Sequence, residues 1–103
     1  MKDKLKRFAE LISAQTEERI RAEYPKMNED YIAADCRVNV KPGRKYTKVD
    51  VGSSGKYMVD ADGNIFGIKG YGVVHTGHRY GTLDTIDEYL WGHYTGVKRA
   101  NPL

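Results

Sequence analysis

The fold of this chain is decided by residues 46–69, YTKVDVGSSGKYMVDADGNIFGIK. Thr47, Val49 and Val51 alternate there with polar side chains, and a period of two is typical of a β-strand that buries one face. Residues 56–60 form another apolar segment after the GSSG interruption. The stretch therefore predicts adjacent antiparallel strands.

The dipeptide Asp62-Gly63 is the strongest turn signal in the chain. Both central residues of a type I′ turn need positive φ, which aspartate and glycine tolerate best. We expect such a turn here, with residues 65–69 pairing back onto residues 56–60.

Further strands are expected on both sides of this hairpin. Residues 36–40 alternate between apolar and polar side chains, and Pro42-Gly43 supplies a turn. A glycine-rich run from 67 to 72 bends the chain, and residues 71–75 fit a fifth strand. The predicted sheet is a curved antiparallel meander of four or five short strands within residues 36–75.

The first 24 residues predict an amphipathic helix, 1–24. Their apolar side chains recur at the 3.6-residue spacing of one helical face, and charged side chains take other positions. Pro25 ends the helix, because the residue before a proline is disfavoured in the helical conformation. Asn28 is a candidate N-cap for a short helix over residues 29–35. The apolar face consists of Leu5, Phe8, Ala9, Ile12 and Ile20.

A short closing helix is predicted over residues 82–91. Asp84 or Thr85 is a candidate cap, and Glu88 stands in capping-box register with Thr85. Gly92 is a suitable stop. Residues 97–103 are expected to form a frayed tail. The apolar face of this helix would consist of Ile86, Tyr89 and Leu90.

Size and composition predict a single domain, residues 1–103, of the α+β class. Hydrophobic residues make up 40% of the chain, which is too many for a disordered protein. Cys36 is the only cysteine, so a disulfide within the chain is excluded. The charged amino-terminal stretch is unlike a secretory signal. We expect a cytoplasmic protein without a membrane span, since no run approaches about 18 apolar residues.

A zinc site would have to use the histidines. His75, His78, His93 and Cys36 are the residues that could assemble a set of nitrogen and sulfur ligands. The pair His75-x-x-His78 is usable, but the remaining spacing matches no strong pattern. Surface or backbone-bonded histidines are the commoner outcome. The sequence therefore predicts neither a metal nor another cofactor.

One arrangement resembles a catalytic site. His78-Arg79 beside Asp84 and Asp87 could act as a general base with carboxylates, as in some nucleases. Helix capping explains the same two acids. Cys36, at the start of a half-buried strand, is more typical of a core residue than of a thiolate nucleophile. The sequence predicts a protein that is not an enzyme.

Positive charge is concentrated in the predicted sheet. Residues 37–80 hold eight lysines and arginines against three aspartates, a net charge of +5. Tyrosines interleave with these basic residues, and their rings can stack on unpaired bases at about 1–3 kcal/mol each. Lysine and arginine neutralise phosphates. The predicted binding residues are Arg44, Lys45, Tyr46, Lys48, Lys56, Tyr57, Lys69, Tyr71 and Arg79.

Two other interpretations of these residues stay open. The tyrosines could be half buried beneath the helices, with the lysines protecting strand edges from aggregation. Tyrosine and arginine also anchor protein interfaces, so the same surface could hold a protein partner. The oligomeric state stays open as well, including a homodimer.

Residues 48–60 (KVDVGSSGKYMVD), 63–72 (GNIFGIKGYG) and 77–84 (GHRYGTLD) resemble small proteins encoded by bacteriophages and prophages. The resemblance implies a location in the cytoplasm of a bacterial host and carries over no catalytic residues. Such proteins commonly bind nucleic acid, host machinery or defence complexes such as CRISPR effectors.

We therefore expect a small non-enzymatic protein, encoded by a phage, that engages nucleic acid or a nucleoprotein complex through a basic, tyrosine-rich sheet surface. The alternative is a counter-defence or host-takeover inhibitor of the anti-CRISPR type, which binds and blocks a host protein.

Overall fold

The amino-terminal helix forms as the sequence predicts. In the computed structural model, which describes residues 2–93 and 96–99, α1 spans Lys2–Glu23. Thr16 continues the buried stripe where an apolar residue is missing. The helix ends just before Pro25, as expected from the effect of proline on the preceding residue. The buried stripe consists of Leu5, Phe8, Ile12, Thr16 and Ile20.

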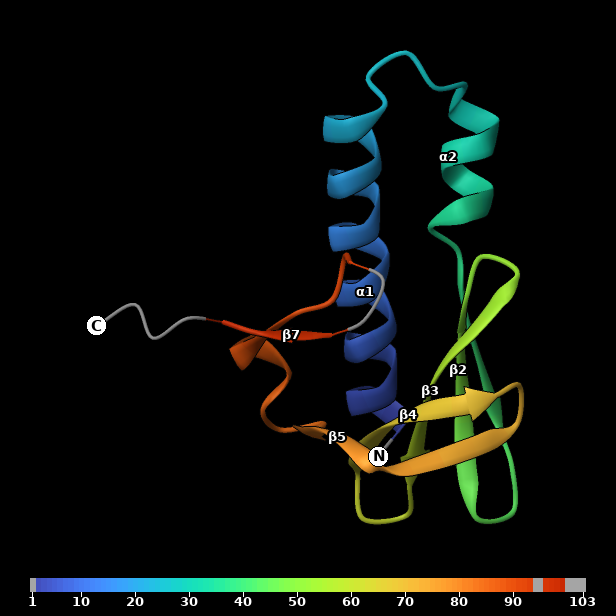
Figure 1. The fold of residues 1–103 in the computed structure, drawn as a ribbon, viewed down its shortest axis with the longest axis vertical. Helices are drawn as coiled ribbons and strands as arrows, with labels where there is room; N and C mark the ends of the chain where they lie inside the picture. The colour runs from blue at the N-terminus through green and yellow to red at the C-terminus, as the bar shows by residue number, and fades with distance from the viewer. Residues whose placement is uncertain (1, 94–95, 100–103) are drawn as a thin grey trace.

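A second, shorter helix, α2 (Glu29–Asp35), packs beside α1 (Figure 1). The Asn28 side chain accepts a hydrogen bond of 2.7 Å from a backbone amide of its first turn, which confirms the predicted N-cap. Ile32 and Cys36 pack with Ile20 in a small apolar cluster. Cys36 is therefore a buried residue of the protein interior.

Five antiparallel strands follow one another across one sheet, which confirms the predicted meander. The sheet begins at residue 38 and extends to residue 82, whereas the prediction was 36–75. Figure 1 shows β4 and β5 running crosswise to β2 and β3. The strands are β1 (Val38–Pro42), β2 (Tyr46–Val51), β3 (Ser54–Asp60), β4 (Asn64–Gly70) and β5 (Val73–Thr82).

The fifth strand is longer than predicted because it contains a bulge. Gly67 of β4 lies opposite His75, but the preceding residue of β4 lies opposite Arg79. Residues 76–78 therefore have no partner in β4, and the strand continues beyond them. A bulge of this kind breaks the alternation that the sequence prediction relied on.

The main core lies between α1 and one face of the sheet. Its centre is aromatic: the Phe8 ring lies 4.8 Å from the Trp91 ring and 5.9 Å from the Tyr57 ring, measured between centroids. Edge-to-face and tilted contacts of this kind are favourable for aromatic side chains. The buried members are Leu5, Phe8, Ile12, Val49, Val51, Tyr57, Val59, Ile65, Leu83, Ile86 and Trp91.

The turn between β3 and β4 differs from the predicted type I′ turn. The Asp60 carbonyl accepts a hydrogen bond from the Gly63 amide at 3.0 Å, so residues 61 and 62 are central and Gly63 follows with φ 87°. The Asp60 carboxylate also accepts bonds from the Asp62 and Asn64 amides. Burial raises the pKa of Asp60, but the hydrogen bonds from Asn64 and Asp62 outweigh it and leave the pKa below its ordinary value.

The closing helix predicted for residues 82–91 is wrong. The segment contains one turn of 3₁₀ helix, η1 (Ile86–Glu88), followed by β6 (Tyr89–Leu90). Strand β6 pairs with β7 (Val97–Lys98) as a separate two-stranded sheet. The predicted tail therefore begins with a strand, and residues 100–103 lie outside the described part of the chain.

Local hydrogen bonds explain why no regular helix forms there. The Thr85 hydroxyl accepts a bond from the Thr82 amide at 2.9 Å and also bonds the Thr82 carbonyl, so it closes a loop and does not cap a helix. Farther on, the Trp91 amide donates to Gln15 Oε1 of α1 at 2.6 Å, and the indole donates to the Ile86 carbonyl at 2.9 Å. Local bonds of the Thr85 hydroxyl and the indole, together with one bond from α1, thus take the place of regular helical bonds.

Candidate functional site

The side of the sheet away from α1 carries one residue from each strand in a continuous line. Residues directly opposite each other in antiparallel strands project from the same face. Their neighbours Val49, Val59 and Ile65 are in the core, so this line lies on the other face. From β1 to β5 the line is Lys41, Lys48, Met58, Phe66 and Arg79.

Two tyrosines complete this surface, which we call the basic face: Lys41, Tyr46, Lys48, Met58, Phe66, Tyr71 and Arg79. Tyr46 lies two residues from Lys48 on the same strand face, and its ring lies edge-on to the Phe66 ring at 6.3 Å. Met58 is buried at the centre, whereas Lys41 and Arg79 are exposed. The surface thus combines an apolar centre with cations from three strands.

Tyr71 is fixed on the basic face by a buried carboxylate. Its hydroxyl donates to Asp50 Oδ2 at 3.0 Å and accepts from Lys41 Nζ at 3.2 Å. Lys41 Nζ also lies 3.1 Å from Asp50 Oδ2. These hydrogen bonds to Tyr71 and Asp50 raise the pKa of Lys41. Lys48 Nζ lies 5.0 Å from the centroid of the Tyr71 ring, which is 57% exposed.

The other predicted cations are distributed around this face. Arg44 and Lys45 are exposed in the turn before β2, and Lys45 Nζ lies 5.6 Å from the Tyr46 ring centroid. Arg79 donates to Asn64 Oδ1 at 2.6 Å. Lys69 is exposed near the end of β4, without a hydrogen bond or ion pair among the described residues. The structure thus groups Lys48, Arg79, Tyr46 and Tyr71, with Arg44 and Lys45 beside them.

Tyr57 is not available for binding, contrary to the sequence prediction. Its side chain is 2% exposed and packs in the core against Phe8, Tyr80 and Trp91. Burial raises the pKa of Tyr57, so the phenol stays protonated. Its hydroxyl is buried and has no hydrogen-bond partner among the described residues. A ring in this position cannot stack on a base.

Lys56 lies on the opposite side of the sheet from the basic face because of a β-bulge. Val49 lies opposite Tyr57 and Asp50 lies opposite Gly55, so no residue of β2 lies directly opposite Lys56 in the strand register. Such a bulge redirects the side chain. Lys56 Nζ donates to the His93 carbonyl at 3.0 Å. Burial lowers the pKa of Lys56, and the positive charge of Arg19 lowers it further.

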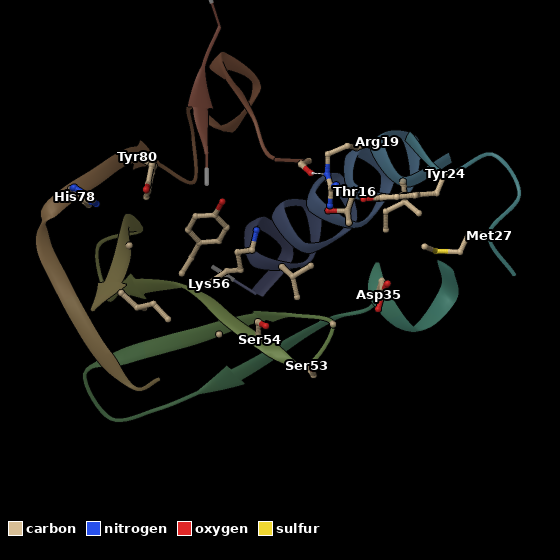
Figure 2. Close-up of a pocket in the computed structure, with 18 residues that line it drawn as sticks. Thr16, Arg19, Tyr24, Met27, Asp35, Ser53, Ser54, Lys56, His78 and Tyr80 are labelled. Carbon is tan, nitrogen blue, oxygen red and sulfur yellow. Dashed lines mark hydrogen bonds between the residues drawn. The ribbon is translucent and has the colours of Figure 1, made fainter. Parts of the chain in front are cut away.

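A cleft of about 500 Å³ opens on this helix side of the sheet. Figure 2 shows Arg19 projecting from α1 on one side, with Ser53 and Ser54 across from it and Lys56 near the centre. His78, from the bulge of β5, lies at one end. Apolar side chains, including Ile20, Val51 and Ile68, contribute to the wall.

The histidines do not form a metal-binding cluster. The His75 and His78 rings lie 4.3 Å apart, His75 Nδ1 is buried without a partner, and His93 is exposed. Within residues 2–93 and 96–99, no three His, Cys, Asp or Glu side chains lie close enough to hold a metal ion. The paired acids Asp84 and Asp87 bond Lys4 and Arg7 of α1 instead.

Sequence reasoning missed three residues of these surfaces. Lys41 and Asp50 follow the same alternation as Lys48, so the sequence pattern could have placed them on the outer face of the sheet. The contact with Tyr71 that buries Asp50 could not be predicted from that pattern. Arg19 lies on the polar side of the α1 pattern, and nothing local indicates that it faces a cleft.

Comparison of the chain with protein-family models, curated proteins and solved structures finds no match. Within the described ranges, no helix is both long enough and apolar enough to cross a membrane.

Proposed function

We propose that this chain is a non-enzymatic binding protein that engages the phosphate backbone of nucleic acid, free or within a nucleoprotein complex, through the basic face. The observation that carries the proposal is the line of opposed residues in which Lys41, Lys48 and Arg79 lie on one side of the sheet. Phosphate contacts by such cations supply most of the non-specific affinity of nucleic-acid-binding proteins.

The aromatic side chains of the basic face would contact bases. Tyr71 is 57% exposed, and its hydroxyl is held in place by Asp50 and Lys41. A ring that is already fixed loses little freedom when a base stacks on it. Tyr46 and Phe66, which contact each other, offer a second apolar surface beside Arg79. The arrangement favours single strands, whose bases are accessible.

The test is fluorescence anisotropy with labelled single-stranded DNA, single-stranded RNA and duplex DNA at two salt concentrations. We expect affinity for single strands to fall steeply with salt, with a slope of about −0.7 per phosphate contact. Lys48→Gln should weaken binding and reduce the slope by about one contact.

Lys6→Gln is the matched control, because it removes the same charge from an exposed position of α1. It should leave the affinity near that of the unmodified protein. Absence of binding at low salt would contradict the proposal, and so would an equal loss in both variants.

A second candidate function is supported by an exposed apolar surface at the corner between α1 and α2. Tyr24 and Tyr31 are 53% and 68% exposed there, and with Pro25 and Met27 they line a shallow groove of about 450 Å³. Exposed tyrosines are frequent anchors of protein interfaces. This surface suits a phage counter-defence protein that binds and blocks a host protein.

The two candidates differ in the surface that each requires. A stoichiometric complex with a host protein that is lost in Tyr24→Ala/Tyr31→Ala, but retained in Lys48→Gln, would favour the inhibitor. A complex that is lost only in Lys48→Gln would instead favour binding through the basic face.

A further inference from the structure

The helix-side cleft is separate from the basic face and has its own charged groups. It is bounded by α1, by the β2–β3 turn and by β3, β4 and β5. Its volume of about 500 Å³ lies within the range of about 300–1,000 Å³ that is usual for sites of small organic ligands. Apolar surface and polar groups are both present, which is also usual for such sites.

Arg19 is held in place and keeps unused donors. Its Nε donates to the Gly92 carbonyl, and its Nη1 pairs with Glu23 at 3.3 Å. A guanidinium has five N–H donors, so these two bonds leave three donors without a partner among the described residues. The side chain is 31% exposed. Arg19 is therefore oriented by the fold while still able to bind a ligand oxygen.

Lys56 adds a second positive charge close to the first. The carbonyls of Gly92 and His93, which are neighbours in sequence, each accept a hydrogen bond from one of the two side chains. The electrostatic effect of Arg19 on Lys56 indicates that the like charges repel each other in a partly buried site. An anion between them would replace this repulsion with attraction.

The rest of the cleft can hold the body of such a ligand. Asp35 is the acidic side chain of the lining, and Figure 2 shows it well apart from Arg19 and Lys56, on the side of α2. Hydroxyl groups of Ser53 and Ser54 and the imidazole of His78 supply further hydrogen-bonding groups. Ile20, Val51 and Ile68 provide an apolar surface for a ring.

We propose that this cleft binds a small phosphate monoester with a planar ring, of the size of a nucleoside monophosphate. The phosphate lies against Arg19 and Lys56, and the ring lies on the apolar wall. A phosphate monoester carries between one and two negative charges near neutral pH, so it matches two cations better than a single carboxylate does.

The test is isothermal titration calorimetry with three probes: adenosine 5′-monophosphate, adenosine and inorganic phosphate. The monophosphate should bind at least tenfold more tightly than either of the others, because it alone uses both halves of the cleft. Amide chemical shifts measured by NMR should change mainly at Ser53, Ser54 and His78.

Variants of the cleft should lose this binding. Arg19→Gln should lower the affinity for the monophosphate by roughly tenfold or more, as expected for the loss of a charge-assisted hydrogen bond. Because Arg19 also holds Gly92, Ser54→Trp provides a second variant, which fills the cleft from an exposed position without removing a charge. It should abolish binding while the circular dichroism spectrum stays unchanged.

Lys48→Gln distinguishes this site from the basic face. It should leave the affinity for the monophosphate unchanged, and Ser54→Trp should leave the affinity for single-stranded nucleic acid unchanged. No heat of binding at millimolar monophosphate would overturn the proposal. Two other results would overturn it as well: an affinity for adenosine equal to that for the monophosphate, or a loss of monophosphate binding in Lys48→Gln as large as that in the cleft variants.

Discussion

At the scale of single residues, Asp50 is the most informative side chain of the basic face. It is 6% exposed although it lies on the solvent side of the sheet, because Tyr71 and Lys41 cover it. A buried carboxylate is stable only when it is paired and hydrogen-bonded. The contact therefore links the β4–β5 turn to β1 and β2.

Tyr71→Phe should destabilise the protein by about 1–3 kcal/mol, because it removes a hydrogen bond from a buried charged group. The measurement is urea unfolding followed by circular dichroism. Tyr46→Phe makes the same chemical change on the same face, where no hydrogen bond of the hydroxyl is found among the described residues. The control should stay within about 0.5 kcal/mol of the unmodified protein, and equal stability of both variants would refute this role for Tyr71.

Lys56 and Tyr57, the two predicted binding residues that do not lie on the basic face, show what alternation along a single strand cannot predict. Lys48 lies where alternation predicts it, but Lys56 does not, because the bulge opposite Val49 and Asp50 shifts the register. Arg79 reaches the basic face only beyond the bulge of β5, outside the strand that the sequence predicted. No sequence signal of that bulge is apparent beyond Gly55. Tyr57 is buried because Phe8 and Trp91, from distant parts of the chain, meet over it.

At the scale of elements, α1, α2 and the order of the five strands follow from local patterns. The closing segment does not, because its conformation depends on tertiary contacts. Residues 82–91 carry helical spacing and a capping-box pattern, yet Gln15 of α1 bonds the Trp91 amide and the aromatic rings enter the core. Burial of a tryptophan outweighs a few tenths of a kcal/mol of helix propensity per residue.

Gly81 lies where the closing segment leaves the sheet, and its substitution tests whether this turn requires glycine. It has φ 73°, and a Cβ at this position would lie 2.5 Å from the Thr85 hydroxyl. Gly81→Ala should therefore cost at least about 1–2 kcal/mol in the free energy of unfolding. Gly70→Ala is the control, since a Cβ there meets nothing within 4 Å. If thermal unfolding midpoints of the two variants coincide, the turn does not depend on glycine.

At the scale of the whole molecule, the aromatic core joins parts of the chain that no local pattern connects. Trp91 is 1% exposed and contacts Phe8, Tyr57, Tyr80 and Tyr89. Sequence patterns indicated which faces of the helix and strands are apolar. They did not indicate that a side chain near the end of the chain fills the space between them.

Trp91→Ala should cost about 3–5 kcal/mol, a large part of the roughly 5–15 kcal/mol available to a small domain. We expect loss of the near-ultraviolet circular dichroism signal at 37 °C and unfolding at much lower urea concentrations. Tyr31→Ala, at a 68% exposed aromatic residue, should leave both measurements nearly unchanged. A stable, fully folded Trp91→Ala protein would show that the closing segment is dispensable for the core.

The contact between α1 and Trp91 can form only late in biosynthesis. Gln15 and its partner are 76 residues apart, which a ribosome adding about 5–20 residues per second covers in roughly 4–15 s. For that time the apolar stripe of α1 has emerged without the indole that completes its cover. Part of the apolar stripe of α1 therefore stays uncovered in the nascent chain until Trp91 leaves the exit tunnel.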